Sequence, residues 1–156
     1  MVASRLSEPL PVGQLDADHY RAIHRHLFQD VYTWSGRERQ VRTHKGDTTF
    51  CYPENIGPEM RRLFEGLARD NHLRGLEPRA FARAAAKFIG DLNAIHPFRE
   101  GNGRVQQTFL VLLADQAGHT IDLSKVRRGP YLRAMISAYA EDEALLAAEI
   151  ESWMPV

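Results

Sequence analysis

Residues 81–117 read FARAAAKFIGDLNAIHPFREGNGRVQQTFLVLLADQA and contain two long apolar segments separated by a short loop rich in glycine. The first segment, residues 81–95, repeats apolar side chains at helical spacing behind Pro78, a residue favoured in the first turn of a helix. The second, residues 108–117, is apolar nearly all round, which is typical of a helix buried inside a domain, and Gly118 ends it. These two helices and their loop predict the centre of a helical domain.

The chain on either side predicts further helices. Two of them follow residues that can accept hydrogen bonds from the free N–H groups of a first helical turn, Asp16 and Asn55, and carry apolar side chains at helical spacing. Trp34-Ser35-Gly36 interrupts the helical pattern after the first of them. The expected helices cover residues 16–28, 55–67, 130–139 and 143–153.

A short β-hairpin is expected within residues 40–51. Residues 40–43 and 48–51 are rich in β-branched or aromatic side chains, and the turn between them, residues 44–47, contains Lys-Gly-Asp. Because an isolated two-stranded hairpin is marginally stable in water, this one should pack against helices. The predicted fold class is therefore mainly α, with one short hairpin.

Length and composition limit the class of protein. The 156 residues suit one compact domain, since a chain of about 150 residues buries about 70% of its unfolded surface. Residues 1–13 show no periodicity and predict an extended lead-in, and residues 14–156 predict a single domain. No apolar run approaches the roughly 18 residues of a membrane span, so no membrane partner is expected.

Charge and cysteine content limit the partners and the compartment. Lys plus Arg and Asp plus Glu number 20 each, and this zero net charge argues against direct binding of nucleic acid, which needs a clustered cationic surface. The single cysteine, Cys51, cannot form an internal disulfide, which favours a cytoplasmic protein.

The loop between the two central helices, HPFREGNGR from His96 to Arg104, carries the candidate chemistry. Proline disfavours helical geometry in the residue before it, so the first helix should end at His96 and leave an imidazole facing the loop. The Gly-Asn-Gly run tolerates positive φ, lets backbone N–H groups approach a ligand and precedes a helix, which together favour phosphate binding. Arg104 adds a fixed cation, and Glu100 is a suitable ligand for Mg²⁺ beside phosphates. A base, a metal carboxylate, an anion site and an arginine are the parts that phosphoryl-type transfer needs.

The loop resembles the signature of the Fic family, H-P-F-x-[D/E]-G-N-G-R-x-x-R, and matches every specified position up to Arg104. The segment from His24 to Trp34-Ser35-Gly36 is similar to the family's segment ending in W-A-G. The hairpin at residues 40–51 occupies the place of the family's target-docking flap. Fic domains are helical, and most of them transfer AMP from ATP to a hydroxyl group of a target protein.

The resemblance implies a nucleotidyltransferase that uses Mg²⁺ and ATP, and a role for each residue of the loop. His96 would be the general base, Glu100 would hold Mg²⁺, Gly101, Asn102 and Gly103 would bind the α- and β-phosphates, Arg104 would contact the phosphates, and Phe98 would anchor the loop in the core. The flap would align an extended target segment by strand addition through Val41, Thr43, Thr49 and Phe50.

One position departs from the family pattern. The final arginine of the signature falls at residue 107, where this chain has Gln107. Gln107 lies three residues after Arg104 and shares its helix face, so it can still donate hydrogen bonds to the nucleotide, but it carries no charge. Exchanging a charge-assisted bond for a neutral one costs about 1–2 kcal/mol, whereas an arginine that stabilises a transition state can be worth about 10³-fold in rate. The sequence is consistent with either consequence, a modest loss of nucleotide affinity or a large loss of reaction rate.

Two alternatives follow. The first is a weakened or inactive Fic fold that binds a nucleotide or a partner. The replacement of the signature arginine by Gln107 would be the sign of this loss of activity. The second is phosphate transfer, as in the related Doc-type kinases, which carry Lys where this chain has Gly103. The clustered His19, His24 and His26 match no zinc-binding pattern and predict partly exposed helix histidines.

Regulation is the last expectation that the resemblance carries. Fic enzymes are often blocked by a helix with the pattern [S/T]-x-x-x-E-[G/N], and residues 137–142 nearly fit it. Glu141, however, falls where a turn between two helices is expected. We therefore expect inhibition by a small antitoxin protein, as in bacterial toxin–antitoxin pairs, some of whose toxins modify DNA gyrase or a related topoisomerase.

Overall fold

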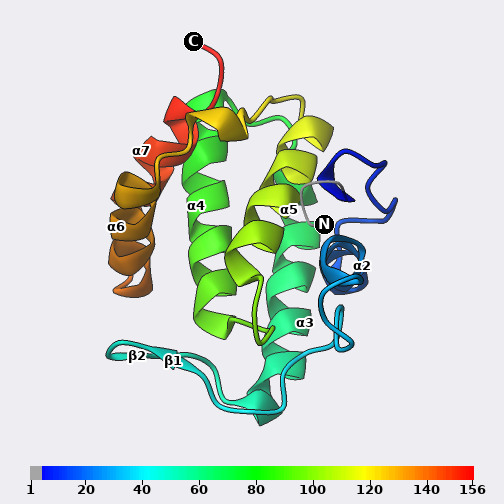
Figure 1. Ribbon diagram of the computed structural model, residues 1–156. Helices are drawn as coiled ribbons and strands as arrows, with labels where there is room; N and C mark the ends of the chain where they lie inside the picture. The colour runs from blue at the N-terminus through cyan, green and yellow to red at the C-terminus, as the bar shows by residue number, and fades with distance from the viewer. Residues whose placement is uncertain (1–4) are drawn as a thin grey trace.

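The computed structural model describes residues 5–156, which form six α-helices and one two-stranded antiparallel sheet (Figure 1). The helices are α2 (Ala17–Phe28), α3 (Pro53–Arg69), α4 (Pro78–Ile95), α5 (Asn102–Gln116), α6 (Arg128–Tyr139) and α7 (Ala144–Ser152), and the strands are β1 (His44–Lys45) and β2 (Thr48–Thr49). Short 3-10 turns at Asn71–Leu73 and Leu123–Lys125 lie between helices. The mainly helical class with one hairpin is confirmed.

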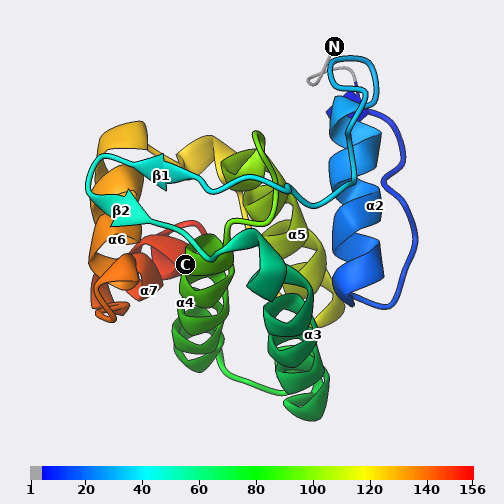
Figure 2. The same ribbon diagram turned by 90° about the horizontal axis from the view of Figure 1, so that it is seen from below.

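Helix α4 is the central element. It packs against α3 and α5 on one side and against α6 and α7 on the other (Figures 1 and 2). Small residues let its neighbours approach: a β-carbon added at Gly90 would lie 3.4 Å from the Cβ of Ala138 in α6. The two apolar segments that flank the glycine-rich loop therefore do form the middle of the domain.

A cluster of aromatic rings joins α2, α3, α4 and α5. Neighbouring ring centroids in it lie 5.3–5.8 Å apart, a spacing at which aromatic pairs attract one another beyond their burial alone. Its members are Tyr20, Phe64, Phe88, Phe98 and Phe109. Phe98 belongs to the loop after α4 and is fully buried, so the cluster ties that loop to the core.

The first residues of the helices agree only in part with those predicted from the sequence. The Asp16 carboxylate accepts a hydrogen bond from the His19 N–H at 2.9 Å and caps α2, as expected. Helix α4 begins at Pro78, also as expected. The expected start of α3 behind Asn55 is wrong, because the helix begins at Pro53, whose fixed φ is preorganised for a first helical turn.

The hairpin is shorter than expected, and its first strand is shifted. His44 pairs with Thr49 and Lys45 with Thr48, so two residues assigned to the turn belong to β1 and residues 40–43 are not a strand. Gly46, at φ 60°, allows a tight turn, so the strands pair directly beside it. Farther from the turn, the carbonyls of Val41 and Cys51 both accept hydrogen bonds from the Arg39 guanidinium. The Arg39 side chain therefore connects the two ends of the hairpin, which do not pair with each other there.

The chain before α2 is fastened to that helix. The Arg5 Nε atom donates to the Asp30 carboxylate at 2.6 Å, just beyond the end of α2. Residues 1–4 of the expected lead-in lie outside the described residues. Over residues 5–156, no helix is both long and apolar enough to cross a membrane.

Candidate active site

The loop between α4 and α5 turns sharply at two left-handed residues. His96 caps the C-terminus of α4 with φ 50° and ψ 64°, which confirms that the helix stops there. Gly101 caps the N-terminus of α5 with φ 83°. A β-carbon at Gly101 would lie 2.5 Å from two ring atoms of Phe28, so only glycine fits this position.

The Asn102 side chain holds the loop closed. Its Oδ1 accepts from the N–H of Phe98 at 3.0 Å, and its Nδ2 donates to the carbonyl of Phe98 at 2.7 Å. Asn102 is buried, and both polar atoms of its amide group are engaged by the Phe98 backbone. Any contact of Asn102 with a ligand therefore falls to its main-chain N–H.

His24 supports the same loop from α2. The Gly36 N–H donates to its Nδ1 at 3.0 Å, so Nε2 carries the proton and donates to the carbonyl of Glu100 at 2.9 Å. Its ring stacks on Phe98 with centroids 3.8 Å apart. Burial lowers the pKa of His24, which keeps the imidazole neutral as both bonds require.

The expectation of partly exposed histidines is wrong for His19 and His24, which are both buried, and holds for His26, which is half-buried. The helical spacing places His24 in line with Ile23 and Leu27 on the buried face of α2. Its partner in the loop, the carbonyl of Glu100, is 76 residues away along the chain, so no local sequence pattern indicates this contact.

A pocket of about 580 Å³ opens between the loop and the hairpin. Its lining combines the loop residues His96, Arg99, Glu100, Gly101, Asn102 and Gly103 with Arg42, Thr43, His44, Lys45 and Phe50 from the hairpin side. Three of these side chains are permanent cations and one is a carboxylate, a balance that suits an anionic ligand.

Glu100 is the acidic group of this pocket. It is exposed, and its carboxylate makes no hydrogen bond or ion pair with any residue from 5 to 156. Within the same residues there is no group of three or more His, Cys, Asp or Glu side chains that could hold a metal by themselves. A lone free carboxylate fits Mg²⁺, which is commonly held by one or two carboxylates together with phosphates and water.

His96 is half-buried beneath the hairpin. The Phe50 ring lies parallel to its imidazole, with centroids 3.8 Å apart. Burial lowers the pKa of His96 from 6.5 to about 4, and the positive charge of Arg39 acts in the same direction. The imidazole is therefore neutral at pH 7 and has a nitrogen lone pair free to take a proton.

The remaining residues singled out in the sequence lie around this pocket or away from it. Phe98 is buried beneath the loop, and Arg104 is exposed in the first turn of α5. Val41 and Thr49 are exposed on the hairpin but do not line the pocket.

Gln107 is half-buried away from the pocket, on the side of α5 that faces α6 and α7. It contributes to a small cavity with Tyr131, and its amide partly offsets the rise that burial causes in the pKa of that tyrosine. In this arrangement the Gln107 amide is turned toward the core.

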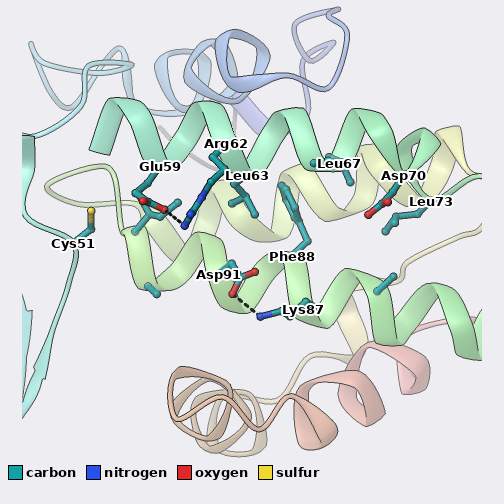
Figure 3. A pocket seen from close by; sticks show the side chains of 14 residues that line it. Cys51, Glu59, Arg62, Leu63, Leu67, Asp70, Leu73, Lys87, Phe88 and Asp91 are labelled. Carbon is teal, nitrogen blue, oxygen red and sulfur yellow. Dashed lines mark hydrogen bonds and ion pairs between the residues drawn. The ribbon is translucent and has the colours of Figure 1, made fainter. Parts of the chain in front are cut away.

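A larger cavity, of about 690 Å³, lies between α3 and α4 (Figure 3). Its floor is apolar, and four of the charged groups along its rim form two ion pairs, Arg62 with Glu59 at 2.6 Å and Lys87 with Asp91 at 3.1 Å. None of its lining residues belongs to the loop between His96 and Arg104. The loop that carries the candidate chemistry therefore opens only onto the smaller of these two pockets.

The model of the Fic/DOC family matches residues 14–114. The chain belongs to the Fic/DOC family. The match includes α2, the hairpin, the whole of the loop and most of α5, so every element that lines the pocket lies inside it.

Curated relatives and solved structures agree with this membership. The chain is 53% identical over 151 residues to the probable protein adenylyltransferase y4lH of Sinorhizobium fredii, covering 96% of this chain and 79% of the relative. It is 41% identical over 138 residues to the protein adenylyltransferase VbhT of Bartonella schoenbuchensis, covering 88% of this chain and 29% of that longer protein. The crystal structure of BepC from Bartonella tribocorum with bound AMPPNP superimposes with a TM-score of 0.85 at 28% identity, covering 99% of this chain and 80% of that one.

Proposed function

We propose that this Fic protein is a protein adenylyltransferase that transfers AMP from Mg-ATP to a Ser, Thr or Tyr hydroxyl of a target protein. Two curated relatives are named as protein adenylyltransferases, one of them as a probable one, and the crystal structure of a structural neighbour contains the ATP analogue AMPPNP. The observation that carries the proposal is one pocket that combines His96, Glu100 and the start of α5.

The start of α5 would bind the phosphates. The main-chain N–H groups of Asn102, Gly103 and Arg104 have no backbone partner within residues 5–156, and the first hydrogen bond of the helix is made by Val105 to the Gly101 carbonyl at 3.1 Å. Free N–H groups and the positive end of the helix dipole favour phosphate. A β-carbon at Gly103 would meet no atom within 4 Å, so there is space there for a ligand.

Glu100 and Arg104 would complete the nucleotide site. Mg²⁺ held by the Glu100 carboxylate and the phosphates would neutralise part of the charge on the pyrophosphate leaving group. Arg104 projects from the first turn of α5, where its guanidinium can contact phosphate oxygens with fork geometry.

His96 would act as the general base. Its Nδ1 is buried, so Nε2 is the nitrogen that would meet the target hydroxyl. The hydroxyl oxygen would form a bond to the α-phosphorus while its proton passes to Nε2 and the bond between the α-phosphorus and the pyrophosphate oxygen breaks. With a pKa of about 4, His96 is fully neutral at the start of this step.

The hairpin would present the target. Its two strands are only two residues each. The carbonyls of Val41, Thr43 and Thr49 already accept hydrogen bonds, but the main-chain N–H groups of Val41 and Thr43 have no backbone partner within residues 5–156. An extended target segment can add to such an edge through main-chain hydrogen bonds. Because Phe50 stacks on His96, a segment on this edge would lie beside the base.

We further propose that the protein acts in the cytoplasm as the toxin of a toxin–antitoxin pair and is inhibited by a helix of a small antitoxin. Glu141 lies in the turn between α6 and α7 with φ 66°, so the near match at residues 137–142 is not an uninterrupted helix of this chain. DNA gyrase or a related topoisomerase is the first target to test.

A second candidate is a fold that binds nucleotide without transferring it. Gln107 favours it, because its amide faces Tyr131 and no charged group replaces the arginine of the family signature. The third candidate, phosphate transfer, is disfavoured by Gly103, since a lysine occupies this place in the Doc-type kinases.

The test uses ATP labelled separately at the α- and γ-phosphates, incubated with Mg²⁺, the protein and a cell lysate, alongside a His96→Ala control. Transfer of the α-label alone, lost in the control, supports AMP transfer. Transfer of the γ-label contradicts it and indicates a kinase. Binding of ATP without any transfer favours the second candidate, and Gln107→Arg then tests whether one missing charge is the reason.

A further inference from the structure

Arg39, in the segment between α2 and β1, is a buried cation with an unusual set of partners. It is 3% exposed. Its guanidinium donates four hydrogen bonds to main-chain carbonyls, and its own main-chain N–H donates a fifth. The acceptors are the carbonyls of Ile95 at 3.1 Å, His96 at 2.7 Å, Val41 at 2.7 Å and Cys51 at 2.6 Å for the side chain, and of Pro97 at 2.9 Å for the main chain.

The charge of Arg39 is balanced without a carboxylate. Within residues 5–156 it makes no ion pair with any Asp or Glu. A buried charge is tolerated only where hydrogen bonds and local dipoles compensate the lost water. The carbonyls of Ile95 and His96 are at the C-terminus of α4, the negative end of the helix dipole, and they supply that compensation.

The partners of Arg39 fall into two groups. The carbonyls of Ile95 and His96 belong to the two peptides that flank His96, and the carbonyl of Pro97 belongs to the next peptide. His96 holds a left-handed conformation that residues other than glycine rarely adopt. The carbonyls of Val41 and Cys51 belong to the two ends of the hairpin. One side chain therefore joins the residue that carries the imidazole to both ends of the hairpin that faces it.

We propose that Arg39 is a positioning residue for the transfer reaction: it fixes the backbone of His96 and sets the distance from that imidazole to a target segment on the hairpin. This inference rests on the proposed AMP transfer. Arg39 makes no hydrogen bond to residues 98–104, so the phosphate site is formed without it. Its loss should therefore slow transfer while ATP binding is retained.

The geometry requires arginine and not merely a positive charge. The four acceptors surround the guanidinium plane, and its Nε and two Nη atoms reach them from fixed directions. A lysine ammonium is a point charge with three donors on one atom and cannot span the same acceptors. Arg39→Lys therefore keeps the charge and removes the positioning.

The first experiment compares Arg39→Lys with Arg37→Lys, a matched control two residues away whose side chain is exposed. We expect Arg39→Lys to slow α-label transfer by about 10²-fold, the effect of misplacing a reacting group by about 1 Å. The dissociation constant for Mg-ATP should change by less than about threefold, and Arg37→Lys should change neither quantity. Equal losses of transfer and ATP affinity, or transfer at the wild-type rate, would overturn the proposal.

The second experiment needs no transfer activity, so it separates failure of this inference from failure of the proposed function. Amide hydrogen exchange should accelerate in Arg39→Lys at Cys51, whose N–H donates to the Ala94 carbonyl at 3.1 Å, and at His96, whose N–H donates to Leu92 at 2.9 Å. Exchange at Val105, whose N–H bonds the phosphate loop at Gly101, should not change. Unchanged exchange at both Cys51 and His96 overturns the proposal.

A measurement on the wild-type protein covers the case in which Arg39→Lys does not fold. With all of its nitrogens engaged, the Arg39 guanidinium should give resolved NMR signals for its N–H protons that exchange slowly with water. Arg37 provides the contrast, because its exposed guanidinium should exchange rapidly. Rapid exchange of the Arg39 protons would show a free side chain and overturn the proposal.

Discussion

The Phe50 ring lies flat on the His96 imidazole, with centroids 3.8 Å apart and ring planes inclined by 6°. Tyr139 of α6 meets the other side of this contact: its ring packs edge-on against Phe50, and its hydroxyl donates to the Thr49 carbonyl at 2.7 Å. The hairpin is thus held between α6 and the end of α4. The proposed base is covered by an apolar ring before any target arrives.

This contact predicts the effect of removing the ring. Phe50→Ala should raise the pKa of His96 from about 4 toward 6.5, because burial is the largest cause of the depressed value. The measurement is an NMR titration of the imidazole C–H signals. Tyr139→Phe is the matched control, since it removes the hydroxyl bond to Thr49 and keeps both rings. A His96 pKa that stays near 4 in Phe50→Ala would assign the shift to Arg39 instead of to burial.

Stability should depend on pH through the same imidazole. The pKa of His96 is about 4 in the folded state and 6.5 in the unfolded chain, so below pH 6.5 the unfolded state binds more protons. The free energy of unfolding should be greatest above pH 6.5 and fall as the pH drops toward 4, by about 3 kcal/mol in all. Urea unfolding at a series of pH values measures it. His96→Asn should flatten the dependence, leaving the smaller contributions of His24 and His72, whose lowered pKa values have the same sign. If the free energy of unfolding changed equally with pH in the wild type and in His96→Asn, His96 would not be the cause of the dependence.

The two glycines of the loop should respond differently to alanine. Gly101→Ala forces a side chain into the left-handed region and against the Phe28 ring, and should lower the free energy of unfolding by about 2–4 kcal/mol. Gly103→Ala lies in the first turn of α5 with open space around it, and should leave the protein equally stable or up to about 1 kcal/mol more stable.

ATP titration then separates folding from binding in this pair. Gly103→Ala should weaken Mg-ATP binding although it is stable, because its methyl group would occupy the space proposed for the phosphates. If Gly103→Ala bound Mg-ATP like the wild type, the phosphate site would not lie over the start of α5.

The helices and the loop were readable from the sequence because their signals are local. Pro97 after His96 marks the end of α4, Pro78 marks its start, and the apolar run after residue 107 requires a buried helix. The same nine residues that match the family signature also fold back on themselves through Asn102 and Phe98, so their resemblance and part of their conformation depend on local sequence alone.

Three features could not be predicted because their causes are distant in the sequence. Arg39 is buried by carbonyls 56 and 57 residues away, and nothing in the polar segment around it distinguishes it from the exposed Arg37. The hairpin pairs two residues closer to its turn than expected because the Arg39 guanidinium separates its ends. His24 follows the apolar spacing of α2, but its partner is the carbonyl of Glu100.

The two hydrogen bonds of His24 can be tested separately. In His24→Gln, the side-chain amide nitrogen reaches about as far as Nε2 and can still donate to the Glu100 carbonyl, while the acceptor for Gly36 is lost. In His24→Asn, the amide oxygen lies about where Nδ1 lies and still accepts from Gly36, while the bond to the loop is lost. Both variants should be destabilised by a similar amount, about 1–3 kcal/mol, since each leaves one buried polar group unpaired.

Their effects on the nucleotide site should differ. If the bond to Glu100 holds the phosphate loop in place, His24→Asn should bind Mg-ATP about tenfold more weakly than His24→Gln, which corresponds to about 1.4 kcal/mol. The comparison requires both proteins to be folded, which urea unfolding in the same buffer establishes. Equal ATP affinities in the two variants would mean that His24 stabilises the fold without shaping the loop, and that Asn102 and the Phe98 anchor suffice to hold it.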